Sequence, residues 1–135
     1  MTNPVGASLT TSATLLRRAL QVDAVVSGAT GLLLTAAAGP LADLLGLHVD
    51  LLRFAGLSLL PFAILLAWLA ARPTVPRRMV WAVIAYNLLW AVDSILLLTT
   101  GWVSPTTLGM LFVAGQALIV AGLAELQWFG LRRAT

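Results

Sequence analysis

The chain has 135 residues, of which 60% are hydrophobic and only 10% are charged. Soluble domains carry about 25% charged residues, so this composition excludes a water-soluble domain and indicates a helical membrane protein. The basic residues are all arginines scattered among apolar stretches, which excludes a nucleic-acid-binding face, and the lack of cysteine excludes disulfides and thiol chemistry.

The chain divides into a short tail and one membrane domain. Residues 1–14 are small and polar, and we expect a flexible N-terminal tail. Residues 15–135 are expected to form a single domain of four membrane-spanning helices, because a span needs about 20 mainly apolar residues. The segments that meet this length, separated by glycine, proline and charged residues, are 19–39, 51–71, 79–100 and 106–130. The expected fold class is all-α, an integral membrane four-helix up-down bundle.

The first segment also has features of a signal peptide. Arg17 and Arg18 precede an apolar run that ends in small residues. The run is longer than a signal sequence, however, and Asp23 interrupts its start, so we expect a retained helix.

Segments 19–39 and 106–130 each carry a face of small residues, which lets two helices approach closely in lipid. The first face repeats every fourth residue: Asp23, Ser27, Gly31, Thr35 and Gly39. The second consists of Ala114, Ala117, Ala121 and Glu125, with Gly122 beside them. The first and last helices of an up-down bundle are neighbours, so we expect these faces to meet, with Asp23 near Glu125.

The middle segments contribute a proline and a charge pair. Pro61 is expected to kink the segment 51–71 or to mark a packing adjustment without ending the helix. Arg53 has a long side chain and is expected to form a structural ion pair with Asp93.

Polar residues inside the spans form two layers when they are counted from the arginines at about 1.5 Å per residue. The inner layer contains Asp23, Asn87 and Glu125, and the outer layer contains Arg53, Asp93 and Gln116. Ionisable groups within a membrane should face protein or water, so the residues of these layers other than Arg53 are candidate ligand or proton sites. Trp90 completes that set, because Tyr86, Trp90 and Asp93 share one helical face.

Each candidate has a structural alternative. Asp23 and Glu125 either fix the register of two helices or share a proton. Asn87 and Gln116 either hydrogen-bond between helices or contact a ligand. The face with Trp90 either packs in the core or lines a ligand cavity.

The arginines predict the orientation. All of them except Arg53 lie on the side of the spans that carries both termini, and the positive-inside rule makes this side cytoplasmic. Interfacial tryptophans agree: Trp68, Trp81 and Trp128 lie at the inner boundary and Trp102 at the outer one. The outer loop also contains His48, which is expected to be solvated.

Two stretches of the chain are similar to each other. LLLTAAAGP at 32–40 aligns with LLLTTGWVSP at 96–105, which places Asp23 opposite Asn87. The similarity is either a chance match between apolar sequences or a parallel repeat of two hairpins about an axis along the membrane normal.

Catalytic, metal-binding and phosphate-binding motifs are missing, so we assign no catalytic residue, metal or cofactor and do not favour an enzyme. The expected function is to bind an apolar or amphipathic ligand, or to translocate a small solute, within the bundle. The alternative is a non-catalytic accessory or assembly subunit that docks other membrane proteins, or a second copy of itself, through its small-residue faces. The expected partners are the lipid bilayer and such a ligand or protein, and not nucleic acid.

The stretches VDAVVSGATGLLL, GPLADLLGL and LAELQWFGLRR resemble those of small four-span bacterial inner-membrane proteins of uncharacterised function. The resemblance covers the whole chain. It implies a multi-pass location in the bacterial inner (plasma) membrane and no particular activity. Asp23 also resembles the acid that small multidrug exporters place in their first helix, although the surrounding sequence differs.

Overall fold

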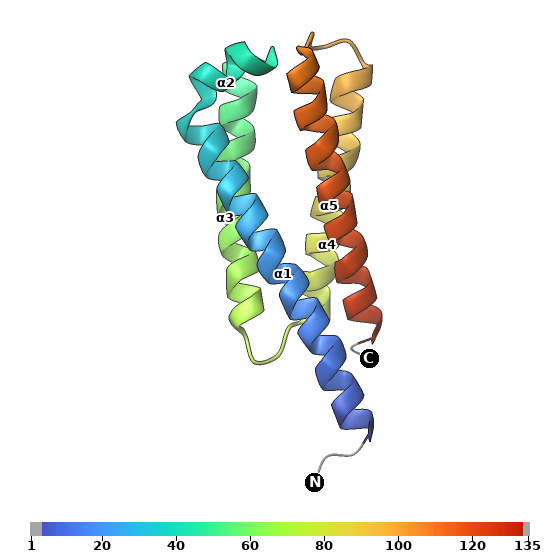
Figure 1. The fold of residues 1–135 in the computed structure, drawn as a ribbon. Coiled ribbons are helices and arrows are strands. Elements are labelled where there is room, and N and C mark those ends of the chain that lie inside the picture. Colours follow the sequence, from blue (N-terminus) through green and yellow to red (C-terminus); the bar gives the residue numbers. More distant parts are fainter. Residues whose placement is uncertain (1–3, 134–135) are drawn as a thin grey trace.

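The computed structural model describes the backbone of residues 4–133 and the side chains of residues 14–133. All regular elements in this part of the chain are helices (Figure 1). In chain order they are α1 (Pro4–Ala36), α2 (Ala38–Leu45), α3 (Val49–Ala71), α4 (Arg77–Thr99) and α5 (Thr107–Arg133).

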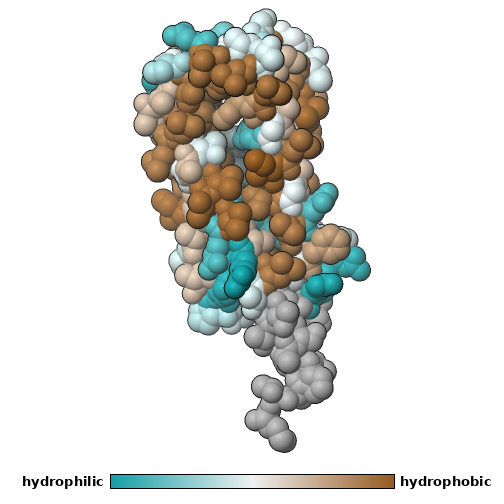
Figure 2. All heavy atoms as spheres, in the orientation of Figure 1, coloured by the Kyte–Doolittle hydropathy of each residue, from teal (hydrophilic) through white to brown (hydrophobic). Residues whose placement is uncertain are grey.

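Four of the helices are long and apolar enough to cross a membrane. The spans cover residues 14–36, 49–71, 77–99 and 107–133, which confirms the number of predicted spans and places their ends within a few residues of the prediction. The chain is therefore all-helical, and these helices indicate a multi-pass membrane protein. Large exposed apolar side chains cover the outside of the helices, and hydrophilic residues gather toward the two ends (Figure 2).

The first connecting segment differs from the prediction because it contains α2. Pro40 lies in the first turn of this helix, where the missing N–H breaks no helical hydrogen bond. Gly46 ends the helix in the left-handed conformation at φ 69°, which glycine adopts without strain.

Residues 4–14, expected as a flexible tail, continue α1, and residues 1–3 lie outside the described part. Helix α3 continues through Pro61, as predicted.

The helices pack as two pairs that meet along one interface. Helix α1 packs most extensively on α3, and α4 packs on α5, while α1 and α5 form the main contact between the pairs. We call the end of the bundle with Pro4 and Arg133 the terminal end, and the opposite end the α2 end (Figure 1). The two pairs lie close together toward the terminal end and diverge toward the α2 end (Figure 1).

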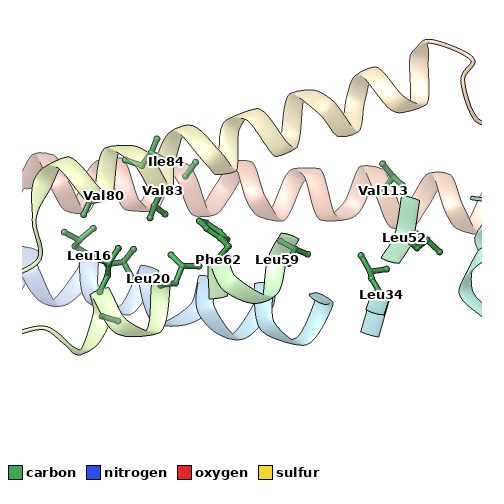
Figure 3. Close-up of a cluster of buried hydrophobic side chains, with 14 of the residues drawn as sticks. Leu16, Leu20, Leu34, Leu52, Leu59, Phe62, Val80, Val83, Ile84 and Val113 are labelled. Atoms are coloured by element: carbon green, nitrogen blue, oxygen red, sulfur yellow. The ribbon is translucent and has the colours of Figure 1, made fainter. Parts of the chain in front are cut away.

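The apolar core follows this arrangement. Leu16, Leu20, Val80 and Val83 form its dense part toward the terminal end, as Figure 3 shows. Leu34, Leu52 and Val113 lie apart from them, toward the α2 end (Figure 3). The buried apolar cluster therefore extends from the terminal end to the α2 end.

Arginines tie the helices together at the terminal end. Arg17 on α1 donates to the carbonyl of Ala70 and to that of Arg72 at 2.6 Å, and thereby caps the end of α3. Arg77 on α4 donates to the carbonyl of Leu131 on α5 at 3.1 Å. The guanidinium of Arg132 lies 4.7 Å from the ring centroid of Trp128, a cation–π contact.

Gly31 and Thr35 of the small-residue face pack against α3, so the predicted contact of this face with the last helix is wrong at these positions. A Cβ atom on Gly56 of α3 would lie 2.8 Å from the carbonyl oxygen of Gly31 and would collide with the Thr35 hydroxyl. Gly56 itself therefore permits this close approach. A Cβ atom on Gly122 of α5 would meet nothing within 4 Å, whereas one on Gly130 would lie 2.8 Å from the Cα of Leu16.

Candidate functional site

A buried polar cluster joins three helices around the carboxyl group of Asp23, whose side chain is 0% exposed. The Asp23 Oδ2 atom accepts hydrogen bonds from Asn87 Nδ2 of α4 and from Gln127 Nε2 of α5, each at 2.7 Å. Its Oδ1 atom accepts a third bond from the Ser27 hydroxyl, one turn along α1, at 2.9 Å. One carboxyl group therefore holds α1, α4 and α5 together.

The cluster is closed by a bond between the two amides. Asn87 Nδ2 also donates to Gln127 Oε1 at 3.1 Å, and both side chains are almost fully buried. Asn87 therefore forms the hydrogen bonds between helices that were one of the two alternatives for this residue. Buried polar groups are normally satisfied in this way, and the bonds of the cluster link α1, α4 and α5.

The predicted pairing of Asp23 with Glu125 is wrong. Glu125 lies on the exposed side of α5, whereas Gln127 lies on the buried side and takes its place. Successive residues of a helix are rotated by about 100°, so a position two residues away points to a different neighbour. Gln127 could have been found from its spacing, because it continues the buried stripe of α5 that also contains Val113, Ala117, Ala124 and Leu131.

The predicted ion pair between Arg53 and Asp93 is also wrong. Both side chains are exposed, and no nitrogen of Arg53 lies within 4.0 Å of a carboxyl oxygen of Asp93 among the described side chains. The two residues lie on α3 and α4, where the helix pairs diverge. A shared depth in the membrane does not bring two residues together when their helices separate.

The divergence of the pairs leaves a cavity of about 550 Å³ toward the α2 end. Leucines from α1, α3 and α4 form much of its wall, and the upper part of the face shown in Figure 2 is hollowed between apolar surfaces. The aromatic lining residues are Phe54, Trp90, Trp102 and Phe112. The polar lining residues are Ser58, Asp93, Ser94, Thr100 and Gln116. The structure thus brings the candidates Trp90, Asp93 and Gln116 to one cavity.

Trp90 has an unusual environment in this wall. Its indole Nε1 is buried and has no hydrogen-bond partner among residues 14–133. The neighbouring Tyr86 does pack in the core, because it stacks on Phe62 at 3.9 Å between ring centroids and bonds to the Ser58 hydroxyl at 2.9 Å. The helical face that was expected either to pack or to line a cavity does both.

Two further findings limit the chemistry of the site. Among the described residues no group of three or more His, Asp or Glu side chains could hold a metal ion. His48 is exposed in the segment between α2 and α3. The cavity can hold a molecule against its leucines and aromatic rings and place a carboxyl group beside it at Asp93.

Comparisons with protein-family models, with curated proteins and with solved structures found no match to this chain. The function must therefore be inferred from the polar cluster and the cavity.

Proposed function

We propose that the protein binds an apolar or amphipathic small molecule in the cavity between its two helix pairs. The observation that carries the proposal is the cavity of about 550 Å³, in which leucines and aromatic rings surround a few polar side chains, among them Asp93 and Gln116. Small-molecule sites typically enclose roughly 300–1,000 Å³ and combine apolar walls with a few polar groups.

Binding is favoured over the translocation of a solute. Transport through the bundle would need a polar path from the cavity to the Asp23 cluster. Trp90 lies between Asn87 and Asp93 along α4, and its ring lies 6.1 Å from that of Tyr86. Tyr86 in turn stacks on Phe62 of α3, so aromatic packing supports a cavity that is closed toward the terminal end.

We infer that the protein lies in the bacterial inner membrane as an up-down bundle with both termini in the cytoplasm. The support is the resemblance of its sequence to small four-span bacterial proteins and the arginines, all of which except Arg53 belong to the terminal end. In this orientation the cavity lies in the outer half of the membrane.

Photolabelling with benzophenone tests the proposed binding. Benzophenone is a neutral, largely apolar aromatic ketone that forms covalent adducts under ultraviolet light. We expect saturable adducts on cavity-lining residues of α3 and α4, located by mass spectrometry. The Ala55→Phe variant should lose most of this labelling, because Ala55 lines the cavity and the ring would fill it.

The matched control is Ala67→Phe, which adds the same ring to an exposed position of α3. This variant should label like the original protein. Adducts spread evenly over the apolar surface, or labelling that Ala55→Phe leaves unchanged, would contradict the proposal.

A second candidate function has one observation in its favour. Gly115 and Gly122 lie seven residues apart on α5, and a Cβ atom on either would meet nothing within 4 Å. Such a face suits the alternative of an accessory subunit that docks a helix of another membrane protein. Replacement of Gly122 by leucine should then abolish copurification of that partner and leave benzophenone labelling intact.

A further inference from the structure

We propose that the ligand is a lipophilic organic cation, whose charge is recognised by the Asp93 carboxylate and by the aromatic rings of the cavity. This inference rests on the proposed binding function, and names the class of ligand. It follows from the charge, the aromatic content and the shape of the lining.

The charge of the cavity lining is negative. Among the described residues, Asp93 is the only charged side chain that lines the cavity, and it has no hydrogen-bond or ion-pair partner there. Asp93 belongs to the membrane-spanning stretch of α4, where an unpaired carboxylate is costly. Arg53 is not part of the lining, so no side chain among residues 14–133 supplies a cation to Asp93.

The aromatic residues surround the same space. Phe54 comes from α3, Trp90 from α4 and Phe112 from α5, so rings line the cavity from three helices. Trp90 and Asp93 are three residues apart and therefore lie on one face of α4. Tryptophan rings attract cations within about 6 Å of their centroid, and the attraction increases when the site is desolvated.

The lining distinguishes an organic cation from a metal ion. Ca²⁺ takes six to eight oxygen ligands and Mg²⁺ requires an octahedral set. The cavity offers a single carboxyl group, and its other polar lining side chains, Ser58, Ser94, Thr100 and Gln116, are neutral. Such a lining leaves most of the charge of a divalent metal ion without a counter-charge. A cation with a large apolar body would instead bury that body against the leucines and place its charge near Asp93.

Two ions of the same shape and opposite charge test the inference. Tetraphenylphosphonium and tetraphenylborate both carry four phenyl groups around one central atom. We expect the purified full-length protein in a non-ionic detergent to bind tritiated tetraphenylphosphonium saturably, measured by scintillation proximity. Tetraphenylborate should compete at least about tenfold more weakly, since two charges 4 Å apart near a protein surface interact by several kcal/mol.

A pair of variants locates the effect. Asp93→Asn keeps the size of the side chain and removes its charge, and should weaken tetraphenylphosphonium binding about tenfold or more. Asp43→Asn is the control, because Asp43 is an exposed acid of α2 that does not line the cavity. Its binding should stay within about twofold of the original, because an exposed charge away from the site is screened.

The outcomes separate the two proposals. Equal binding of the two ions, or unchanged binding in Asp93→Asn, would overturn the cation inference, while benzophenone labelling of the cavity would still support the proposed function. Absence of benzophenone labelling would overturn the proposed function itself. If Asp93→Asn does not fold, the comparison of the two ions on the unaltered protein decides the question.

Discussion

The carboxyl group of Asp23 is the hydrogen-bond acceptor for several other side chains. Its carboxyl oxygens accept from Ser27, Asn87 and Gln127, and these partners are buried. Individual hydrogen bonds between membrane helices contribute only about 0.6 kcal/mol on average. The importance of Asp23 therefore lies less in the strength of each bond than in the donors that would lose their acceptor without it.

Replacement of Asp23 should separate the loss of charge from the loss of an acceptor. Asp23→Leu leaves the Asn87 and Gln127 amides short of an acceptor and should destabilise the fold by about 1–3 kcal/mol. Asp23→Asn should cost less, because its amide oxygen still accepts and its NH₂ can donate to the Ser27 hydroxyl. The measurement is unfolding in mixed micelles with increasing dodecyl sulfate, followed by tryptophan fluorescence.

Glu125→Leu is the control for this series, because it removes an acid from an exposed position of α5. It should leave stability unchanged or slightly raised. Equal stability of the original protein and Asp23→Leu would show that the cluster does not hold the helices together.

Asp23 and its partner on α5 also illustrate how much of the site could be predicted from the sequence. The spacing of the α1 face correctly indicated that Asp23 points into the protein. Its partner was missed, because the choice between Glu125 and Gln127 depends on the rotation of α5 about its own axis. The buried stripe of α5 shows which side of the helix faces the bundle, and Gln127 is the one member of this stripe with a polar side chain.

At the scale of elements, close packing concentrates where α1 crosses α3. Gly56 is buried, and its missing side chain leaves room for Gly31 and Thr35 of α1. In lipid, small residues at such crossings allow the dispersion contacts that replace the hydrophobic effect between helices. The helix ends were easier to predict than these contacts, since composition sets the length of a span but not the helix that its small face meets.

Gly56→Ala should therefore be destabilising although the change is one methyl group. The new Cβ would lie 2.8 Å from the Gly31 carbonyl oxygen and from the Thr35 amide nitrogen, so α1 and α3 must move apart. Overpacking of this kind costs about 1–3 kcal/mol. Gly115→Ala is the matched control, because its Cβ would meet nothing within 4 Å, and alanine favours a helix over glycine. If the two variants unfold at the same dodecyl sulfate fraction, the crossing is not tightly packed.

At the scale of the whole molecule, the contacts between the two helix pairs bear on the predicted repeat. A two-fold repeat would relate α1 to α4 and α3 to α5, and Asp23 and Asn87, aligned in the sequence, do meet at 2.7 Å. The same operation would make the α3–α4 interface equivalent to the α1–α5 interface. Only α1 and α5 pack extensively, so the repeat stays a prediction. The cavity lies where α3 and α4 do not pack as α1 and α5 do. The angle between the helix pairs determines this difference, and the hydropathy of the sequence does not predict that angle.

The orientation of the whole molecule in the membrane can be tested by labelling single cysteines, because the chain contains none. His48 and Thr74 are both exposed, but they lie in the segments before α3 and after it, at opposite ends of that helix. The positive-inside rule places the end that carries most of the arginines in the cytoplasm. In intact cells, His48→Cys should therefore react with a membrane-impermeant maleimide, whereas Thr74→Cys should react only after the cells are permeabilised. The reverse pattern would contradict cytoplasmic termini and would place the cavity in the cytoplasmic half of the membrane.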